Sequence, residues 1–295
     1  MKYQDTFQRY EIKYLLDSHQ KQAILQAMEP YMKLDAYGRT TIRNVYFDTD
    51  NFRLIRRSLE RPAYKEKLRI RSYQQVGPQD PVFVELKKKY KSVVYKRRLS
   101  LPECQVLTCF QEWTPLPVNS QIAQEIEYFR RYYGSLQPKV FLSYEREAFF
   151  ALDGGDFRVT FDENILYRTE ELSLKNGIFG LPLLEDHQTL MELKTSGDIP
   201  LWMSHVLNQQ RAFKTSFSKY GSAYTGVFDP ILKEYTSDFE LTQVRTTHMG
   251  SLFRLTYDLT LSSPGIEKEL IDKLRCRNGN LEITVSKQET TIAEL

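Results

Sequence analysis

The sequence predicts an α+β protein, in which an antiparallel β-barrel flanked by helices precedes a small α+β module. Three observations predict this fold. Charged and apolar residues alternate along at least six expected strands, cap residues mark helices between the strands, and the pattern changes to a compact run of helices and strands after Gly226. A chain of 295 residues can bury a core in one large domain or in two smaller ones.

The first expected elements are a strand and a capped helix. Residues 7–16 read as a strand, and Asp17 then offers an N-cap side chain with Gln20 three residues later. This pair is typical of a capping box, so a helix is expected to begin there. The apolar run 45–47 predicts a second strand, which ends at the turn residues 48–51.

The middle of the chain carries most of the expected strands. Two charged strand segments are predicted over 64–73 and 82–100, on either side of a loop at 77–81. A helix is predicted from Ser120 to Gly134. The remaining expected elements are strands over 139–150 and 156–162 joined by a turn at 153–156, a strand over 186–195 and a helix over 200–217.

The tail forms a separate pattern, and we place a domain boundary near residue 225. The expected domains are 1–225, which holds the barrel, and 226–295, which holds the small module. The expected order in the module is helix, strand, strand, helix, strand, over 227–236, 239–248, 251–261, 264–277 and 280–286. This order is similar to a ferredoxin-like module that lacks its first strand.

Composition narrows the classes of function. No apolar run reaches the ~18 residues that a membrane-spanning helix needs. Residues 1–6 show no signal-peptide pattern, so a cytoplasmic protein is expected. The three cysteines lack CxxC spacing, which fits a reducing compartment and argues against a disulfide framework or a structural zinc site.

Positive charge is concentrated in one part of the chain. Between Arg39 and Arg98 there are 17 Lys and Arg residues against 6 Asp and Glu, although the formal net charge of the whole chain is only +3. Such a local positive field indicates a polyanion ligand. A nucleic acid is not the expected ligand, since the paired aromatic platform of an RNA-binding sheet is not evident.

The basic residues follow the period of a β-strand. Lys65, Lys67, Arg69 and Arg71 occupy every second position, with Leu68 and Ile70 between them, so a strand places the four cations on one face. Like charges on one sheet face repel, so these cations require either full solvation or a polyanion.

The same alternation recurs in other expected strands. It is present in the groups Glu85, Lys87 and Lys89; Glu11 and Lys13; Tyr144 and Arg146; Arg158, Thr160 and Asp162; and Glu192 and Lys194. If the sheet closes into a barrel, the charged faces can point inward while helices cover the apolar outside. An interior lined by Arg and Lys would bind phosphates, and glutamates beside phosphates would hold a divalent metal ion.

Ordered motifs carry a resemblance to a known family. They are RYEIKY (9–14), VYFDT (45–49), YKEKLRIRSY (64–73), VFVELKKK (82–89), YKRR (95–98), FLSYEREAF (141–149), FRVTFDENI (157–165), MELK (191–194) and FSKYG (217–221). Over residues 5–224 the chain resembles the bacterial VTC domain, the polyphosphate polymerase branch of the triphosphate tunnel metalloenzymes, also called CYTH-like proteins. Related triphosphatases begin with ExExK, whereas Arg9 stands at the first Glu position here, which favours the polymerase branch.

The resemblance implies a tunnel that binds ATP and inorganic polyphosphate together with Mn²⁺ or Mg²⁺. The growing polyphosphate chain would take the γ-phosphoryl group of ATP, and ADP would leave. The residues implied for catalysis are Lys13, Arg69, Arg71, Lys87, Lys96, Arg146, Arg158 and Lys219, where the choice among Lys96, Arg97 and Arg98 is open by one residue. The residues implied for substrate binding are Lys65, Lys67, Lys89, Arg98, Tyr144 and Lys194. The implied metal ligands are Glu192, Glu11 and Glu85, with Glu11 and Glu85 equally explained as salt-bridge partners of the cations.

Two other functions fit the same pattern. One is a tunnel-fold tripolyphosphatase or nucleoside triphosphatase, and the other is a non-catalytic polyphosphate receptor docked to a membrane partner. The tail motifs KELIDKLR (268–275) and RNGNLEI (277–283) resemble the soluble end of multi-pass membrane proteins encoded beside bacterial VTC genes. The resemblance implies a multi-pass membrane protein as partner, which would hold the chain at the inner face of the membrane. A fusion of two partners, natural or engineered, would explain this order.

Overall fold

A computed structural model of the chain describes residues 10–59, 62–91, 93–226, 228–247, 252–278 and 282–286. The chain divides into two compact units, Met1–Tyr224 and Thr225–Leu295. Among the described residues, no helix is long and apolar enough to cross a membrane. Arg9, which the sequence comparison singled out, lies outside the described residues.

The first unit is built on one antiparallel sheet, and in the described residues this sheet has eleven strands. The hydrogen-bonded order is β11-β1-β10-β8-β7-β3-β4-β5-β6, with β2 on β7 and β9 on β8. The strands are β1 (Tyr10–Leu16), β2 (Met32–Leu34), β3 (Thr40–Asp48), β4 (Tyr64–Ser72), β5 (Pro81–Tyr90), β6 (Val93–Pro102), β7 (Gln137–Ala151), β8 (Arg158–Arg168), β9 (Leu181–Pro182), β10 (Thr189–Thr195) and β11 (Lys214–Thr215). This arrangement confirms the predicted antiparallel α+β fold.

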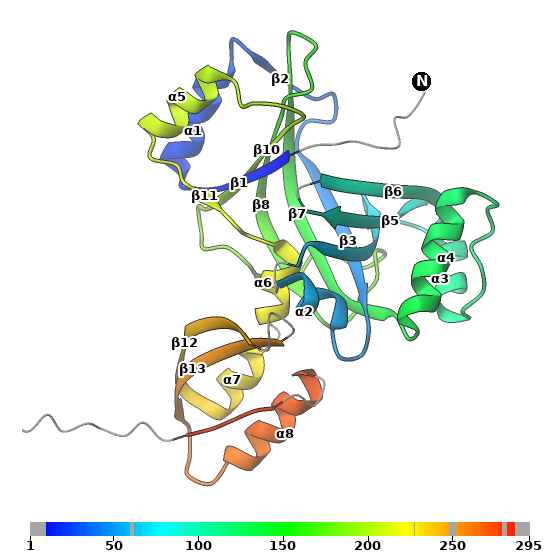
Figure 1. Cartoon of the computed structure of the whole chain (residues 1–295), viewed down its shortest axis with the longest axis vertical. Helices are drawn as coiled ribbons and strands as arrows, with labels where there is room; N and C mark the ends of the chain where they lie inside the picture. The colour runs from blue at the N-terminus through cyan, green and yellow to red at the C-terminus, as the bar shows by residue number, and fades with distance from the viewer. Residues whose placement is uncertain are drawn as a thin grey trace, which may run out of the picture. The chain divides into compact units, whose positions relative to one another are not determined.

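Helices cover the outer face of the sheet on two sides (Figure 1). α3 (Glu103–Gln111) and α4 (Gln121–Tyr133) pack on outward side chains of β4 and β5 such as Leu68, Ile70 and Leu86. α1 (Ser18–Met28) and α5 (Leu201–Gln209) cover β1, β8 and β10 in the same way. α2 (Arg53–Leu59) and α6 (Lys219–Gly226) complete the unit.

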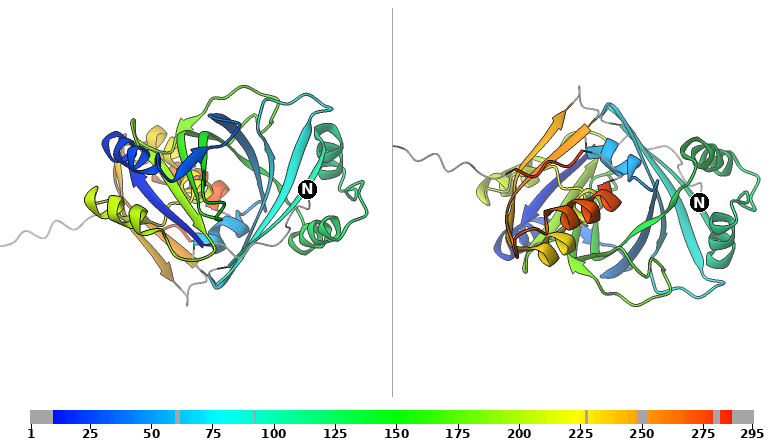
Figure 2. Two further views of the ribbon diagram at one scale, coloured as in Figure 1. Left: turned by 90° about the horizontal axis from the view of Figure 1, so that it is seen from above. Right: turned by 90° about the horizontal axis from the view of Figure 1, so that it is seen from below.

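The sheet of this unit curls round an interior, as the two views of Figure 2 show. Its hydrogen-bonded path runs from β11 to β6 and forms no ladder between β6 and β1 in the described residues. The apolar cores lie between the sheet and the covering helices, so the inward faces are left to the charged residues. This is the arrangement that the alternation predicted.

Caps and turns explain where several elements begin and end. Asp17 and Gln20 form the predicted capping box at the start of α1, and Ser120 caps α4. The predicted segment 82–100 is wrong as a single strand, because Lys91 has a φ of 51° and the chain turns there from β5 into β6. The predicted helix over 200–217 is too long, since α5 ends at Gln209.

The second unit contains α7 (Asp229–Tyr235), β12 (Thr236–Thr247), β13 (Leu252–Leu261) and α8 (Glu267–Asn278). β12 and β13 form an antiparallel pair, and Ile231, Leu232 and Leu270 form a small core with them. Of the predicted last strand over 280–286, the structure describes residues 282–286, which form no strand. The described module therefore has two strands, instead of the three that the ferredoxin-like prediction required.

Candidate functional site

Strand register places the predicted cations on one inner face of the sheet. Lys65, Lys67, Arg69 and Arg71 of β4 lie opposite Lys89, Lys87, Glu85 and Phe83 of β5. On β6, Lys96 pairs with Lys87 and Arg98 pairs with Glu85, so both share this face. Arg97 points outward and binds Glu125 of α4 at 3.1 Å, which resolves the one-residue choice among 96, 97 and 98.

Glu85 is the centre of the first ion-pair cluster. Its carboxylate lies 2.7 Å from Arg69 Nη2, 2.7 Å from Lys96 Nζ, 2.5 Å from Arg98 Nη2 and 3.8 Å from Arg71 Nε. The side chain is only 1% exposed. Burial alone would raise the pKa of this carboxyl, but the cations, Arg69 first, hold the pKa well below its ordinary value. Glu85 is therefore ionised at neutral pH and acts as a counter-ion.

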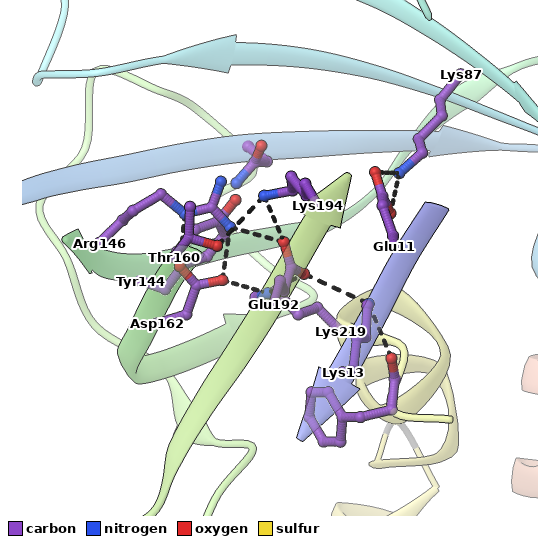
Figure 3. Close-up of polar contacts among 12 residues, drawn as sticks. Glu11, Lys13, Lys87, Tyr144, Arg146, Thr160, Asp162, Glu192, Lys194 and Lys219 are labelled. Carbon is purple, nitrogen blue, oxygen red and sulfur yellow. Dashed lines mark hydrogen bonds and ion pairs between the residues drawn. The ribbon is translucent and has the colours of Figure 1, made fainter. Parts of the chain in front are cut away.

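A second cluster surrounds Glu192 and Asp162 (Figure 3). Arg146 binds Asp162 at 2.6 Å and Glu192 at 3.3 Å, and Lys219 binds the same two carboxylates at 2.5 and 3.3 Å. Lys13 and Lys194 add contacts to Glu192 at 3.4 and 3.0 Å. Burial opposes ionisation of both carboxyls, yet these cations lower both pKa values.

One ion pair joins the two sides of the interior. Glu11 on β1 contacts Lys87 Nζ on β5 with both carboxylate oxygens, at 3.0 and 2.9 Å (Figure 3). The charge of Lys87 is the main cause that lowers the pKa of Glu11 to about 2. This contact spans strands that are far apart in the hydrogen-bonded order of the sheet.

Lys67 has no carboxylate within ion-pair distance among the described residues. Its ammonium donates to Ser218 Oγ at 3.1 Å and lies 6.0 Å from the ring of Tyr220. Burial is the main cause that lowers its pKa far below the ordinary value, and the neighbouring cations, Lys13 and Lys65 first, add to the effect. A cation that faces mainly other cations is the electrostatic signature of an anion site.

Water reaches the interior. The side chains of Lys87, Lys96 and Arg98 are 35%, 36% and 34% exposed although they lie on the inner face. Burial lowers the pKa of Lys96 to about 7, with Glu85 opposing the shift. These three cationic groups are therefore accessible from solvent.

Of the other predicted residues, Tyr144 lies beside the ion-pair clusters, and the rest lie at the ends of their strands. Tyr144 accepts a hydrogen bond from Arg71 Nη2 at 3.0 Å and lies beside Arg146 and Lys219. Arg158 shares the inner-face register opposite Lys194, but its side chain is exposed at the end of β8. Lys65 and Lys89 pair in register at the far end of β4 and β5.

Several residues of the site were not predicted. They are Asp162, Tyr46, Asn44, Thr160 and Ser218. The alternation with Val159 and Phe161 places Asp162 and Thr160 on the charged face, but the sequence analysis assigned no site role to them. Tyr46 and Ser218 carry no comparable signal in the sequence.

Two carboxylates of the site, Glu192 and Asp162, lie side by side. The described residues hold no group of three or more His, Cys, Asp or Glu able to bind a metal. Mg²⁺ commonly takes one or two carboxylates and completes its shell with substrate phosphate oxygens and water. Glu192 and Asp162 are close enough together to be considered as such a pair, since Arg146 and Lys219 each contact both. Glu85 and Glu11 likewise contact cations with both carboxylate oxygens, as Glu192 and Asp162 do.

Comparison with known families shows which protein family the chain belongs to. Residues 8–228 match the sequence profile of the VTC domain. The chain belongs to the VTC domain family. The charged interior described above lies entirely within the part that this VTC domain covers. No curated protein sequence matches the chain.

Solved structures similar to the VTC chain are distant in sequence. A candidate adenylate cyclase from Bacillus halodurans is 14% identical, with a TM-score of 0.47, over 73% of this chain and 96% of that protein. A candidate adenylate cyclase from Vibrio parahaemolyticus is 13% identical, with a TM-score of 0.41, over 74% and 98%. A protein from Pyrococcus horikoshii is 11% identical, with a TM-score of 0.38, over 74% and 98%.

Proposed function

We propose that this VTC protein is an ATP-dependent polyphosphate polymerase, which transfers the γ-phosphoryl group of ATP to a growing polyphosphate chain and releases ADP. The observation that carries the proposal is the water-accessible inner face, where cations outnumber carboxylates and Lys67 has no carboxylate partner in the described chain. A linear polyanion would neutralise this excess charge.

Phosphoryl transfer needs positioning and charge neutralisation more than covalent chemistry. In the proposed reaction Arg69, Arg71 and Arg146 bind phosphate oxygens, and their counter-ions hold the guanidinium groups in place beforehand. Mn²⁺ or Mg²⁺ at Glu192 and Asp162 would add charge neutralisation when bound.

The ion pairs also favour a phosphate acceptor over water. A water nucleophile has to lose a proton, and a carboxylate is the usual acceptor of that proton. The interior carboxylates described here, Glu11, Glu85, Asp162 and Glu192, all contact cations and all have lowered pKa values, so they are weak bases. The terminal phosphate of a polyphosphate chain is already ionised near neutral pH and needs no base.

The proposal is tested by product analysis with matched variants. Purified protein is incubated with ATP and Mn²⁺, polyphosphate is resolved on a gel, and ADP and free phosphate are assayed in parallel. We expect a polymer ladder from the wild type and none from Lys87→Ala or Arg69→Ala, with both variants folded. Lys88→Ala is the matched control, because Lys88 is on the outer side of β5 and pairs with Glu125.

Each other outcome identifies a rival function. ATP consumption that yields free phosphate without polymer would contradict the polymerase and favour a triphosphatase. Unchanged ATP in the presence of a folded protein that still binds polyphosphate would contradict it and favour a receptor. Polymer synthesis by Arg69→Ala or Lys87→Ala at the wild-type rate would overturn the assignment of the inner face.

A further inference from the structure

Asp48 is a buried carboxylate outside the charged clusters. It ends β3, is fully buried, and accepts hydrogen bonds from the backbone N–H groups of Thr49, Leu54 and Ile55 at 2.8, 2.8 and 2.9 Å. Its Oδ2 also accepts a bond from the hydroxyl of Tyr220 at 2.9 Å, across 172 residues of sequence. One side chain therefore ties the end of β3 to the first turn of α2 and to α6.

Tyr220 reaches the inner face through its ring. The ring stacks on Tyr46 with centroids 4.5 Å apart and an interplanar angle of 16°. The Tyr46 hydroxyl in turn accepts a hydrogen bond from Arg69 Nη1 at 2.9 Å. Asp48 and Tyr220 thus stand directly behind a guanidinium group of the proposed phosphate site.

The first residues of α6 and those just before it carry groups of the site. The carbonyl of Phe217 accepts from Lys13 Nζ at 2.9 Å, and Ser218 Oγ accepts from Lys67 Nζ at 3.1 Å. Lys219 binds Asp162 and Glu192. The orientation of these groups depends on where the first turn of α6 lies.

α6 also packs tightly against α2. A Cβ atom on Gly221 would lie 2.9 Å from Leu59 Cδ2 and 3.1 Å from the side chain of Ser218. Glycine at this position allows the close approach that brings Tyr220 within hydrogen-bond distance of Asp48. The hydrogen bond between Tyr220 and Asp48 is therefore held at both residues, by the packing of α6 on α2 and by the backbone donors to Asp48.

We propose that Asp48 and Tyr220 are positioning residues, whose hydrogen bond sets the first turn of α6 so that Lys219 and Ser218 face the bound phosphates. This inference rests on the proposed function for its ligand class. It assigns roles to the Asp of VYFDT and the Tyr of SKYG, which the phosphate-binding set leaves unexplained.

The test measures binding rather than turnover. Tripolyphosphate affinity is determined by calorimetry for the wild type, Tyr220→Phe, Lys219→Ala and the double variant. Tyr220→Phe keeps the ring stack and leaves Asp48 with its three backbone donors, so the fold should survive. Tyr133→Phe is the matched control, since it removes a buried tyrosine hydroxyl that also donates to a carboxylate, Glu66, but on the outer side of the sheet.

We expect Tyr220→Phe to weaken binding about tenfold and Tyr133→Phe to leave it unchanged. In the Lys219→Ala background Tyr220→Phe should weaken binding less than it does in the wild type, because part of its effect acts through Lys219. Wild-type affinity in Tyr220→Phe, or a loss that simply adds to that of Lys219→Ala, would overturn the positioning role. Absence of tripolyphosphate binding by the wild type would instead contradict the proposed function.

Discussion

Glu85 offers the sharpest prediction of stability, because one buried carboxylate contacts four cations. Replacing it by Gln leaves Arg69, Arg71, Lys96 and Arg98 close together without a counter-ion. Removal of one partner from a buried ion pair costs about 3–5 kcal/mol of unfolding free energy. We therefore expect the unfolding free energy of Glu85→Gln, measured by urea or guanidinium denaturation at pH 7, to be about 3–5 kcal/mol below that of the wild type.

The same variant carries a signature of ligand binding. Tripolyphosphate should restore part of the lost stability, because a bound polyanion replaces the missing negative charge, and a ligand at a hundred times its dissociation constant contributes about 2.7 kcal/mol. The pKa of Glu85 lies well below its ordinary value, so its stabilisation is complete at neutral pH and is lost as the pH falls below about 4.5. The stability of Glu85→Gln should therefore lack the part of the acid dependence that Glu85 causes.

Glu125→Gln is the matched control. Glu125 also binds two cations, Lys88 and Arg97, but on the outer face, where its side chain is 22% exposed. Glu125→Gln should lower the free energy of unfolding by less than about 1 kcal/mol. Equal destabilisation by the two variants, or a cost below about 1 kcal/mol for Glu85→Gln, would refute the reasoning about the buried cluster.

Three further predictions concern single groups. Lys67→Met should raise the denaturation midpoint, because it removes a cation that repels its neighbours. It should also weaken tripolyphosphate binding at least about tenfold, because Lys67 would donate to phosphate. Unchanged affinity would contradict this role. With its pKa near 7, Lys96 is charged at pH 6 and mostly neutral at pH 8, so tripolyphosphate affinity should fall up to about tenfold over this range. Calorimetry on Lys96→Arg should show a smaller fall, and identical pH profiles would exclude Lys96 as the cause. Gly221→Ala should lower the free energy of unfolding by about 1–3 kcal/mol and weaken tripolyphosphate binding, because its Cβ would overlap Leu59. Wild-type values of both quantities would contradict the tight packing of α6.

The strand alternation made much of the curved sheet predictable. Lys65 to Arg71 alternate with Leu68 and Ile70, and the structure places the two sets on opposite faces of β4. The caps at Asp17 and Ser120 were equally local signals and are confirmed. Charge at a period of two is unusual enough to identify an inner face without knowledge of the partner strands.

The parts that failed depend on contacts distant in sequence. Residues 200–217 look helical, but Arg211 has a φ of 50° and Lys214–Thr215 pairs with β1 instead. Helix α6 is short and polar at its start, and its Tyr220 contacts Asp48 across 172 residues of sequence, so its own pattern does not predict where it lies. Likewise, the pairing of Glu85 with four cations required the register of three strands.

The most direct test of the polymerase is a phosphorus NMR time course on the wild-type protein with ATP and Mg²⁺. The account predicts that signals of internal polyphosphate groups grow as the ATP γ-phosphate signal falls, with one ADP formed for each phosphate incorporated. Conversion of the γ-phosphate signal into that of free phosphate alone would contradict the account.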